Sequence, residues 1–144
     1  MDKRSNATQL RRDPVSLASV AFLAANLLHG FDHLRTGTDR LTTEVRLGGF
    51  LVTIAALGMV YLALRSCPRA PLIAILIGSW SGVLIASAHL APHWSALSDS
   101  YWDLKPDAFS WAVAAAEVTA ALVLLLVGLS TLRGQAAGPA GASA

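Results

Sequence analysis

The sequence predicts an all-α membrane protein, an antiparallel bundle of four transmembrane helices with both termini in the cytoplasm. Three observations lead to this fold class. First, 54% of the 144 residues are hydrophobic and only 14% are charged, whereas a soluble domain carries about 25% charged residues. Second, the charged residues other than Glu117 collect at the ends of the chain and in short segments between and at the edges of four long apolar runs. Third, these runs lack the polar face that each helix of a soluble bundle presents to water.

Each apolar run is long enough for one membrane crossing. A helix needs about 20 mainly apolar residues to cross a hydrocarbon core of about 30 Å, and its backbone groups must be paired within the helix. Only Glu117 interrupts the fourth run, and the third contains no Asp, Glu, Lys or Arg. We expect a basic cytoplasmic arm at residues 1–13, a transmembrane domain at 14–133 and a disordered cytoplasmic tail at 134–144. The spans are predicted at about 14–33, 47–65, 71–91 and 108–132.

The basic residues predict the orientation of the bundle. Seven of the eleven Lys and Arg residues lie in the N-terminal arm, between the second and third spans, or after the fourth span. The other four share the opposite side with six Asp and Glu residues. Because an excess of Lys and Arg marks the cytoplasmic side, both termini are expected there, in a multi-pass protein of the cell membrane.

Aromatic and small residues predict which surfaces face lipid and which face the bundle interior. We expect Trp80, in the middle of the third span, to lie in the core. Helices in lipid associate through small residues, so small and polar stripes mark the interior faces. An aromatic belt at the outer boundary is expected from Trp94, Tyr101, Trp102 and Trp111. The interior stripes are Asn26, His29 and His33 in the first span, Gly49, Thr53 and Ala56 in the second, Gly78, Gly82 and Ala86 in the third, and Ala114, Glu117 and Ala121 in the fourth.

All four histidines fall at the outer ends of the first and third spans, which run in the same direction. The first span carries two of them one turn apart with an aspartate between them, and the third carries the other two at the same spacing. Glu117 lies about 13 Å below the outer end of the fourth span, at about 1.5 Å per residue. Imidazole and carboxylate suit zinc, iron, nickel and copper(II). We therefore predict a divalent transition-metal site formed by His29, Asp32, His33, His89, His93 and Glu117.

Simpler interpretations of the same residues stay open. Pro92 disfavours helix at Ala91 and is expected to end the third span there, which leaves the direction of His93 undetermined. A histidine at the end of a helix is commonly solvated. A charged side chain inside a span costs roughly 2.5–3.5 kcal/mol on insertion scales. Glu117 is therefore expected either to have a functional role or to be neutral and hydrogen-bonded to Asn26 or a serine.

The segment Gly30-Phe31-Asp32-His33-Leu34 resembles the Gly-x-Asp-His core of the hydrogenase- and urease-associated nickel permeases. The resemblance covers this segment alone and implies nickel as one candidate ion. Those permeases also contain an upstream His-Pro pair and more spans. In this chain the upstream histidine, His29, is closer and no proline follows it. We do not assign the chain to that family.

Three functions are compatible with these features. The first is a membrane protein with an outward-facing metal site, for metal handling or for metal-dependent chemistry on a lipid-soluble or periplasmic substrate. The second is a haem b or quinone electron-transfer subunit, with His29 and His89 as axial ligands on facing helices. The third is an inert accessory subunit of a larger membrane complex. No nucleophile with an adjacent base is recognisable, so no enzyme class or catalytic residue is predicted. The expected partners are the lipid bilayer and either further copies of the chain or a larger membrane complex, and no nucleic acid.

Overall fold

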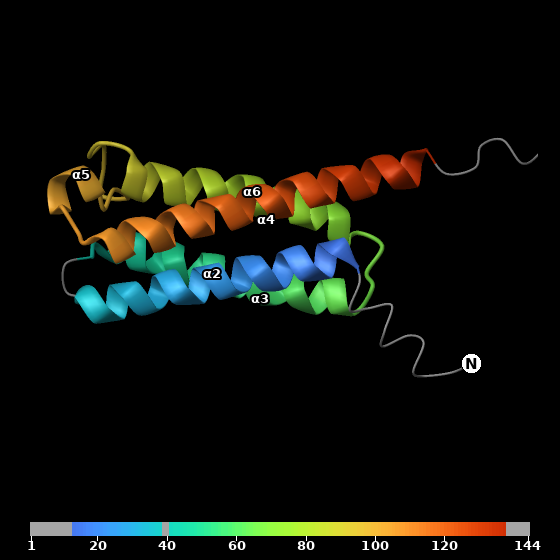
Figure 1. The fold of residues 1–144 in the computed structure, drawn as a ribbon, viewed down its shortest axis with the longest axis horizontal. Helices are drawn as coiled ribbons and strands as arrows, with labels where there is room; N and C mark the ends of the chain where they lie inside the picture. Colours follow the sequence, from blue (N-terminus) through green and yellow to red (C-terminus); the bar gives the residue numbers. More distant parts are fainter. Residues whose placement is uncertain (1–12, 39–40, 138–144) are drawn as a thin grey trace, which may run out of the picture.

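The computed structural model describes residues 13–38 and 41–137, and these residues form helices joined by short connections (Figure 1). Four helical segments in this part of the chain are long and apolar enough to cross a membrane. The third of them combines an α-helix with a final π-helical turn. The predicted all-helical class with four candidate spans is thereby confirmed, and none of the described residues forms a strand. The helices are α2 (Pro14–Thr36), α3 (Thr43–Leu64), α4 (Ala70–Ile85) with the π-turn η2 (Ala86–Leu90), the short α5 (Tyr101–Leu104) and α6 (Ala108–Ala136).

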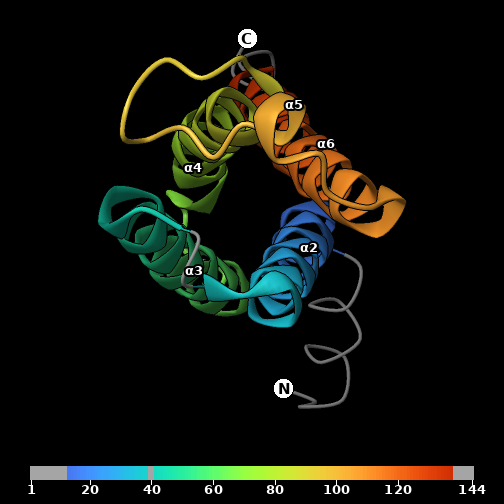
Figure 2. The ribbon, with the colours of Figure 1, turned by 90° about the vertical axis from the view of Figure 1, so that its left-hand side faces the viewer.

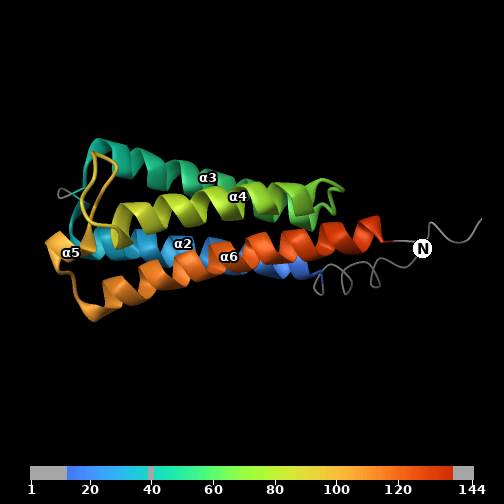
Figure 3. The ribbon, with the colours of Figure 1, turned by 90° about the horizontal axis from the view of Figure 1, so that it is seen from above.

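The four long helices surround a common axis. Figure 2 looks along the bundle and shows α2, α3, α4 and α6 following one another around it, with α6 next to α2. In Figure 1 each long helix starts at the end of the bundle where the preceding one finishes. The last turns of α2 and η2 and the first turns of α3 and α6 therefore lie at one end. The loop 91–100 and α5 cover this same end, as the view from above shows (Figure 3). We call it the loop end, and the opposite end the terminal end.

Side-chain caps fix the starts of three helices. Asp13 accepts hydrogen bonds from two backbone N–H groups in the first turn of α2, at 3.4 and 3.1 Å, and Pro14 needs no such partner. Thr42 caps α3 and Asp107 caps α6 in the same way, at 3.2 and 3.0 Å. Polar caps extend a helix beyond its apolar run, because they satisfy N–H groups that the helix itself leaves unpaired.

Three of the four spans contain helices longer than the apolar runs that predicted them, α3 at its capped start and α2 and α6 at their C-terminal ends. Helix α2 continues to Thr36, and α3 begins at Thr43. Helix α6 continues to Ala136, into the segment expected to be a disordered tail. The rest of that tail and the predicted basic arm at 1–12 lie outside the described residues.

The largest buried apolar side chains and the buried carboxyl, imidazole and amide side chains are concentrated in different halves of the bundle interior. The half toward the terminal end contains the apolar core, in which the side chains of Phe22, Met59 and Leu124 are completely buried. The half toward the loop end holds the buried carboxyl, imidazole and amide side chains, which are Asn26, His29, Asp32, His89, Asp99 and Glu117. Buried serines occur in both halves, Ser16 and Ser19 toward the terminal end and Ser98, Ser100 and Ser110 toward the loop end. The fold thus supplies a packed apolar support beneath a polar site.

Helices α4 and α6 approach each other at backbone distance. A Cβ atom added to Gly78 would lie 2.6 Å from the backbone oxygen of Ala121, and one added to Gly128 would lie 2.6 Å from that of Pro71. Real side chains do not tolerate such distances, so these contacts require glycine. The predicted small-residue stripe of the third span does pack on the fourth helix at Gly78, whereas the contact at Gly128 was not predicted.

Trp80 does not lie in the core, and the expectation that it does is wrong. Its side chain is 72% exposed on the outer surface of α4. In a bilayer, moving a large apolar side chain from the lipid into the bundle interior gives little gain in free energy, because lipid chains are equally apolar. Small residues therefore take the interior positions of α4, and the indole faces outward.

Candidate metal centre

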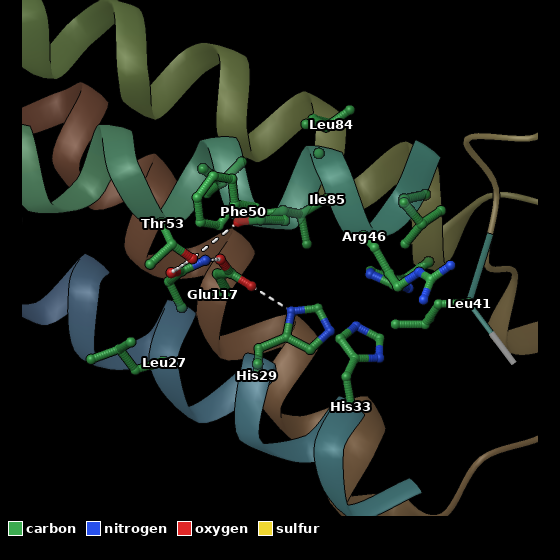
Figure 4. Close-up of a pocket in the computed structure, with 18 of the residues that line it drawn as sticks. Leu27, His29, His33, Leu41, Arg46, Phe50, Thr53, Leu84, Ile85 and Glu117 are labelled. Atoms are coloured by element: carbon green, nitrogen blue, oxygen red, sulfur yellow. Dashed lines mark hydrogen bonds and ion pairs between the residues drawn. The ribbon is translucent and has the colours of Figure 1, made fainter. Parts of the chain in front are cut away.

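Three of the four histidines meet at the loop end of the bundle. His29 and His33 project from successive turns of α2, and His89 comes from the π-turn η2. One ligand nitrogen from each ring can be chosen so that all three lie within 4.8 Å of one another. The ring centroids of His29 lie 4.7 Å from those of both other histidines, and His33 and His89 are 5.3 Å apart. Figure 4 shows His29 and His33 side by side, pointing into a cavity. We call these three residues the histidine cluster.

The π-turn determines where His89 points. Its hydrogen bond runs from the N–H of Ala91 to the carbonyl of Ala86 at 3.2 Å, five residues back instead of four. Ala91 is then extended (ψ 155°), as expected for a residue before proline. The freed carbonyl of Leu90 accepts a hydrogen bond from the Trp102 indole N–H at 2.8 Å, which ties α5 to the turn. Pro92 therefore ends this helix at the predicted place.

Glu117 orients His29 through a buried hydrogen-bond network. One carboxylate oxygen of Glu117 contacts Nδ1 of His29, and the other accepts a hydrogen bond from the Asn26 amide at 2.7 Å. The amide oxygen of Asn26 in turn accepts from the Thr53 hydroxyl at 2.8 Å. The network joins α6, α2 and α3. Because Nδ1 of His29 is held by Glu117, its Nε2 is the nitrogen that remains for another ligand.

His89 is oriented in a comparable way by the loop. Its Nδ1 lies 3.2 Å from the backbone carbonyl oxygen of Asp99 and can donate to it. Asp99 is fixed by its own N–H, which donates to the Ala88 carbonyl at 2.8 Å. Burial raises the pKa of the Asp99 carboxyl above its ordinary value, which favours the neutral form beside the imidazole. Nε2 of His89 thus remains for a ligand, as in His29.

Tyr101 completes the site from α5. Its hydroxyl lies 3.2 Å from Nε2 of His29, and its ring packs on His89 with a centroid distance of 4.8 Å. The side chain is buried, and this burial raises the pKa of the phenol, so Tyr101 stays protonated and can donate a hydrogen bond. The sequence prediction placed Tyr101 in an aromatic belt, and that interpretation missed its place beside the cluster.

Asp32 lies outside the histidine cluster and is bound to Arg35. Its Oδ1 accepts hydrogen bonds from Nε and Nη2 of Arg35, at 3.0 and 2.7 Å. The same guanidinium reaches Asp107 at the start of α6, with Nη1 2.8 Å from Oδ2. The Arg35 guanidinium and the N–H of Ser110 lower the pKa of Asp107 to about 2. Arg35 therefore links the end of α2 to the start of α6.

The predicted site residues thus fall into three groups. His29, His33 and His89 come together, and Glu117 contacts the cluster through His29. Asp32 is engaged by Arg35, and His93 is exposed in the loop after Pro92, outside the cluster. Sequence reasoning missed the contacts of Asp99 and Tyr101. Every residue has a backbone carbonyl, so the sequence pattern could not show that the carbonyl of Asp99 contacts His89.

Two cavities border the histidine cluster, and His33 lines both. The first, which we call the lateral cavity, has a volume of about 520 Å³, lies between α2, α3 and η2, and is lined mainly by apolar side chains (Figure 4). The second, which we call the polar cavity, has a volume of about 290 Å³. Its lining includes the charged side chains of Asp32, Arg35, Asp99, Lys105 and Asp107.

No protein-family model, curated protein or solved structure matches this chain.

Proposed function

We propose that this membrane protein binds a divalent transition metal through His29, His33 and His89, at the extracytoplasmic end of its bundle. The observation that carries the proposal is the hydrogen bonding of the second ring nitrogens. Histidine ligands of metals almost always donate their other N–H to a carboxylate or a backbone carbonyl. His29 has Glu117 as this partner, and His89 has the carbonyl of Asp99.

The size of the cluster is compatible with one ion after a small contraction. Nitrogen ligands of a tetrahedral zinc ion lie about 3.3 Å apart, given Zn–N bonds of about 2.0–2.1 Å. The ligand nitrogens of the cluster are now up to 4.8 Å apart, and rotation of the side chains would bring them to this distance. A metal at Nε2 of His29 replaces the contact with the Tyr101 hydroxyl, which then lies beside the open position of the ion. Three imidazoles with an open fourth position are typical of reactive sites, not of closed structural ones.

The charge distribution supports an extracytoplasmic location. In the described residues, three basic residues lie toward the terminal end (Arg65, Arg69 and Arg133) and three toward the loop end (Arg35, Arg46 and Lys105). The excess comes from the sequence of the N-terminal arm, which carries four more basic residues before α2. By the positive-inside rule the terminal end faces the cytoplasm. The cluster then serves metal handling or metal-dependent chemistry at the outer face of the cell membrane.

The packing of the rings argues against the haem alternative. Axial histidines bind a haem iron from opposite faces of the macrocycle, so the porphyrin must pass between them. The rings of His29 and His89 are in edge contact, and His33 lies against both. Bis-histidine haem binding would require the rings of His29 and His89 to separate. Binding of a single ion requires only that the ligand nitrogens move closer together.

Metal content of the purified protein tests the proposal. The full chain, isolated with an affinity tag that contains no histidine, is loaded with zinc(II) or cobalt(II), desalted, and assayed by elemental analysis. We expect one ion per chain in the wild type and a large loss in His29→Ala and His89→Ala.

His93→Ala is the matched control, because His93 is exposed and lies outside the cluster. It should retain the ion. Equal metal content in all four proteins would show that the cluster is not the binding site.

A further inference from the structure

The lateral cavity has the dimensions of a small-molecule site. Its volume of about 520 Å³ lies within the range of about 300–1,000 Å³ that is usual for ligand pockets. Its walls come from the outer halves of α2 and α3, with Leu84, Ile85 and Ala88 closing it from behind. Most of the lining is apolar, as expected for a site that binds the apolar part of a ligand.

The polar groups of the lateral cavity lie in two places: Glu44 and Arg46 come from the first turn of α3, and the others lie around the histidine cluster, where most of them are already hydrogen-bonded. Asn26, Thr53 and Glu117 are bonded to one another or to His29. The imidazole of His33 makes no hydrogen bond with the described residues, and all three histidines line the cavity. The cavity therefore offers imidazole nitrogens or, once these hold an ion, the open coordination position of the metal, and the spectrum of the bound metal distinguishes this position from the Arg46 guanidinium on α3.

The rim of the lateral cavity consists of large apolar residues. Leu27, Phe31 and Leu34 of α2 and Phe50 of α3 are between 55% and 72% exposed, although they line the cavity. Helices of this length and composition contact the bilayer, so these side chains face lipid chains. A molecule dissolved in the membrane can thus reach the cavity between α2 and α3 without passing through water.

We infer that the lateral cavity binds a membrane-soluble amphiphile that carries an oxygen donor at one end of an apolar chain or ring. The oxygen takes the open position of the metal at the histidine cluster, and the apolar part lies between α2 and α3. This inference rests on the proposed metal site and names the class of its substrate. The polar cavity, whose lining includes carboxylates, also reaches His33 and offers the ion an approach that does not pass through the lateral cavity.

Two glycines of α3 allow a test that does not touch the metal site. A Cβ atom at Gly49 or at Gly58 would meet nothing within 4 Å, so the backbone accepts a larger residue at either position. Gly49 lines the lateral cavity, whereas Gly58 is absent from its lining. Gly49→Phe should fill the cavity, and Gly58→Phe is the matched control on the same helix.

The first measurement uses dodecanoate with a photoreactive diazirine on its chain. Cobalt(II)-loaded protein in nanodiscs of zwitterionic lipid is irradiated, and the labelled peptides are identified by mass spectrometry. We expect labelling of residues 27–34 and 45–53 in the wild type and in Gly58→Phe. In Gly49→Phe this labelling should fall by roughly tenfold or more, because the added ring occupies the ligand's volume. A diazirine-bearing dodecane, which lacks the oxygen donor, should label these residues no more than other lipid-facing residues.

The second measurement follows the visible d–d spectrum of bound cobalt(II) during titration with dodecanoate. We expect the spectrum to change in the wild type and in Gly58→Phe, but not in Gly49→Phe, which should still bind cobalt. If cobalt does not bind at all, the metal site itself is wrong and the inference falls with it. If cobalt binds, but dodecanoate neither changes its spectrum nor labels the cavity more than the dodecane probe does, only the inference is overturned.

Discussion

At the scale of single residues, Glu117 has the clearest measurable role. Its carboxylate contacts Nδ1 of His29 and is buried to 1% exposure. In Glu117→Gln the neutral amide cannot stabilise the positive charge that develops on a metal-bound imidazole, and its NH₂ group faces the NH₂ of Asn26. Loss of such a partner typically weakens metal binding by about 10–100-fold.

We expect this loss of affinity in a competition titration of Glu117→Gln with a zinc chelator. Asp103→Asn, an exposed change near the same end, should bind as the wild type does. Unchanged affinity in Glu117→Gln would mean that Glu117 only fills space.

Asp107 gives a prediction for the dependence of stability on pH. Its pKa is lowered from 3.8 to about 2, first by the hydrogen bond from Arg35. A lowered pKa means that the folded state holds the ionised form more strongly than the unfolded state does. The stabilising contribution is therefore complete above the ordinary value of 3.8 and is lost as the pH falls through about 2.

Thermal unfolding of the wild type and Asp107→Asn in detergent would measure this contribution. We expect Asp107→Asn to be less stable at pH values above 3.8 and the difference to vanish toward pH 2. The exposed Asp103→Asn should show no such convergence. A difference between wild type and Asp107→Asn that stays constant with pH would contradict the proposed ion pair.

At the scale of elements, two glycines of α4 that look alike in the sequence have different tolerances. A Cβ atom at Gly78 would lie 2.6 Å from a backbone oxygen and 2.7 Å from a backbone nitrogen of α6, and neither can move alone. At Gly82 the nearest atom is the Cβ of Ala121, at an ordinary distance of 3.5 Å. We expect Gly78→Ala to lower the free energy of unfolding by about 1–3 kcal/mol or more, because α4 and α6 must separate. Gly82→Ala should be close to neutral in thermal unfolding in detergent. Equal effects would mean that the helices are not in contact at Gly78.

The end of the third span shows how far sequence reasoning reaches for one element. Pro92 ended the helix where it was expected to, because the residue before a proline avoids the helical region. The π-turn that precedes it was not foreseen. The turn sets the direction of His89, and it depends on tertiary hydrogen bonds such as that from Trp102 to Leu90. Local spacing contains no information about such contacts.

At the scale of the whole molecule, the orientation can be tested with a native cysteine. Cys67 is the one cysteine of the sequence and lies between α3 and α4, at the terminal end. If this end is cytoplasmic, a membrane-impermeant maleimide should label Cys67 in lysed cells and not in intact ones. The variant Cys67→Ser with Ala96→Cys places the thiol in the loop 91–100 and should be labelled in intact cells. The reverse pattern would place the histidine cluster on the cytoplasmic side.

The overall architecture followed from the sequence more directly than the site did. Unbroken apolar runs predicted the four long helices, because lipid demands length and apolarity from each span separately. The spacing of His29 and His33 placed them on one face of α2, which the structure retains. The misplacement of Trp80 and Tyr101 has one cause. Aromatic residues can face lipid, a headgroup or a polar cluster, and only the packing of several helices decides among these surroundings.

The separation of the bundle interior into an apolar half and a polar half has a practical consequence. Phe22, Met59 and Leu124 hold the helices together far from the histidines. Local opening of the loop end can therefore occur while the opposite half stays folded, so the side chains of the histidine cluster can exchange their partners without unfolding of the bundle. Substitutions in the histidine cluster should accordingly change ligand binding more than they change the stability of the bundle.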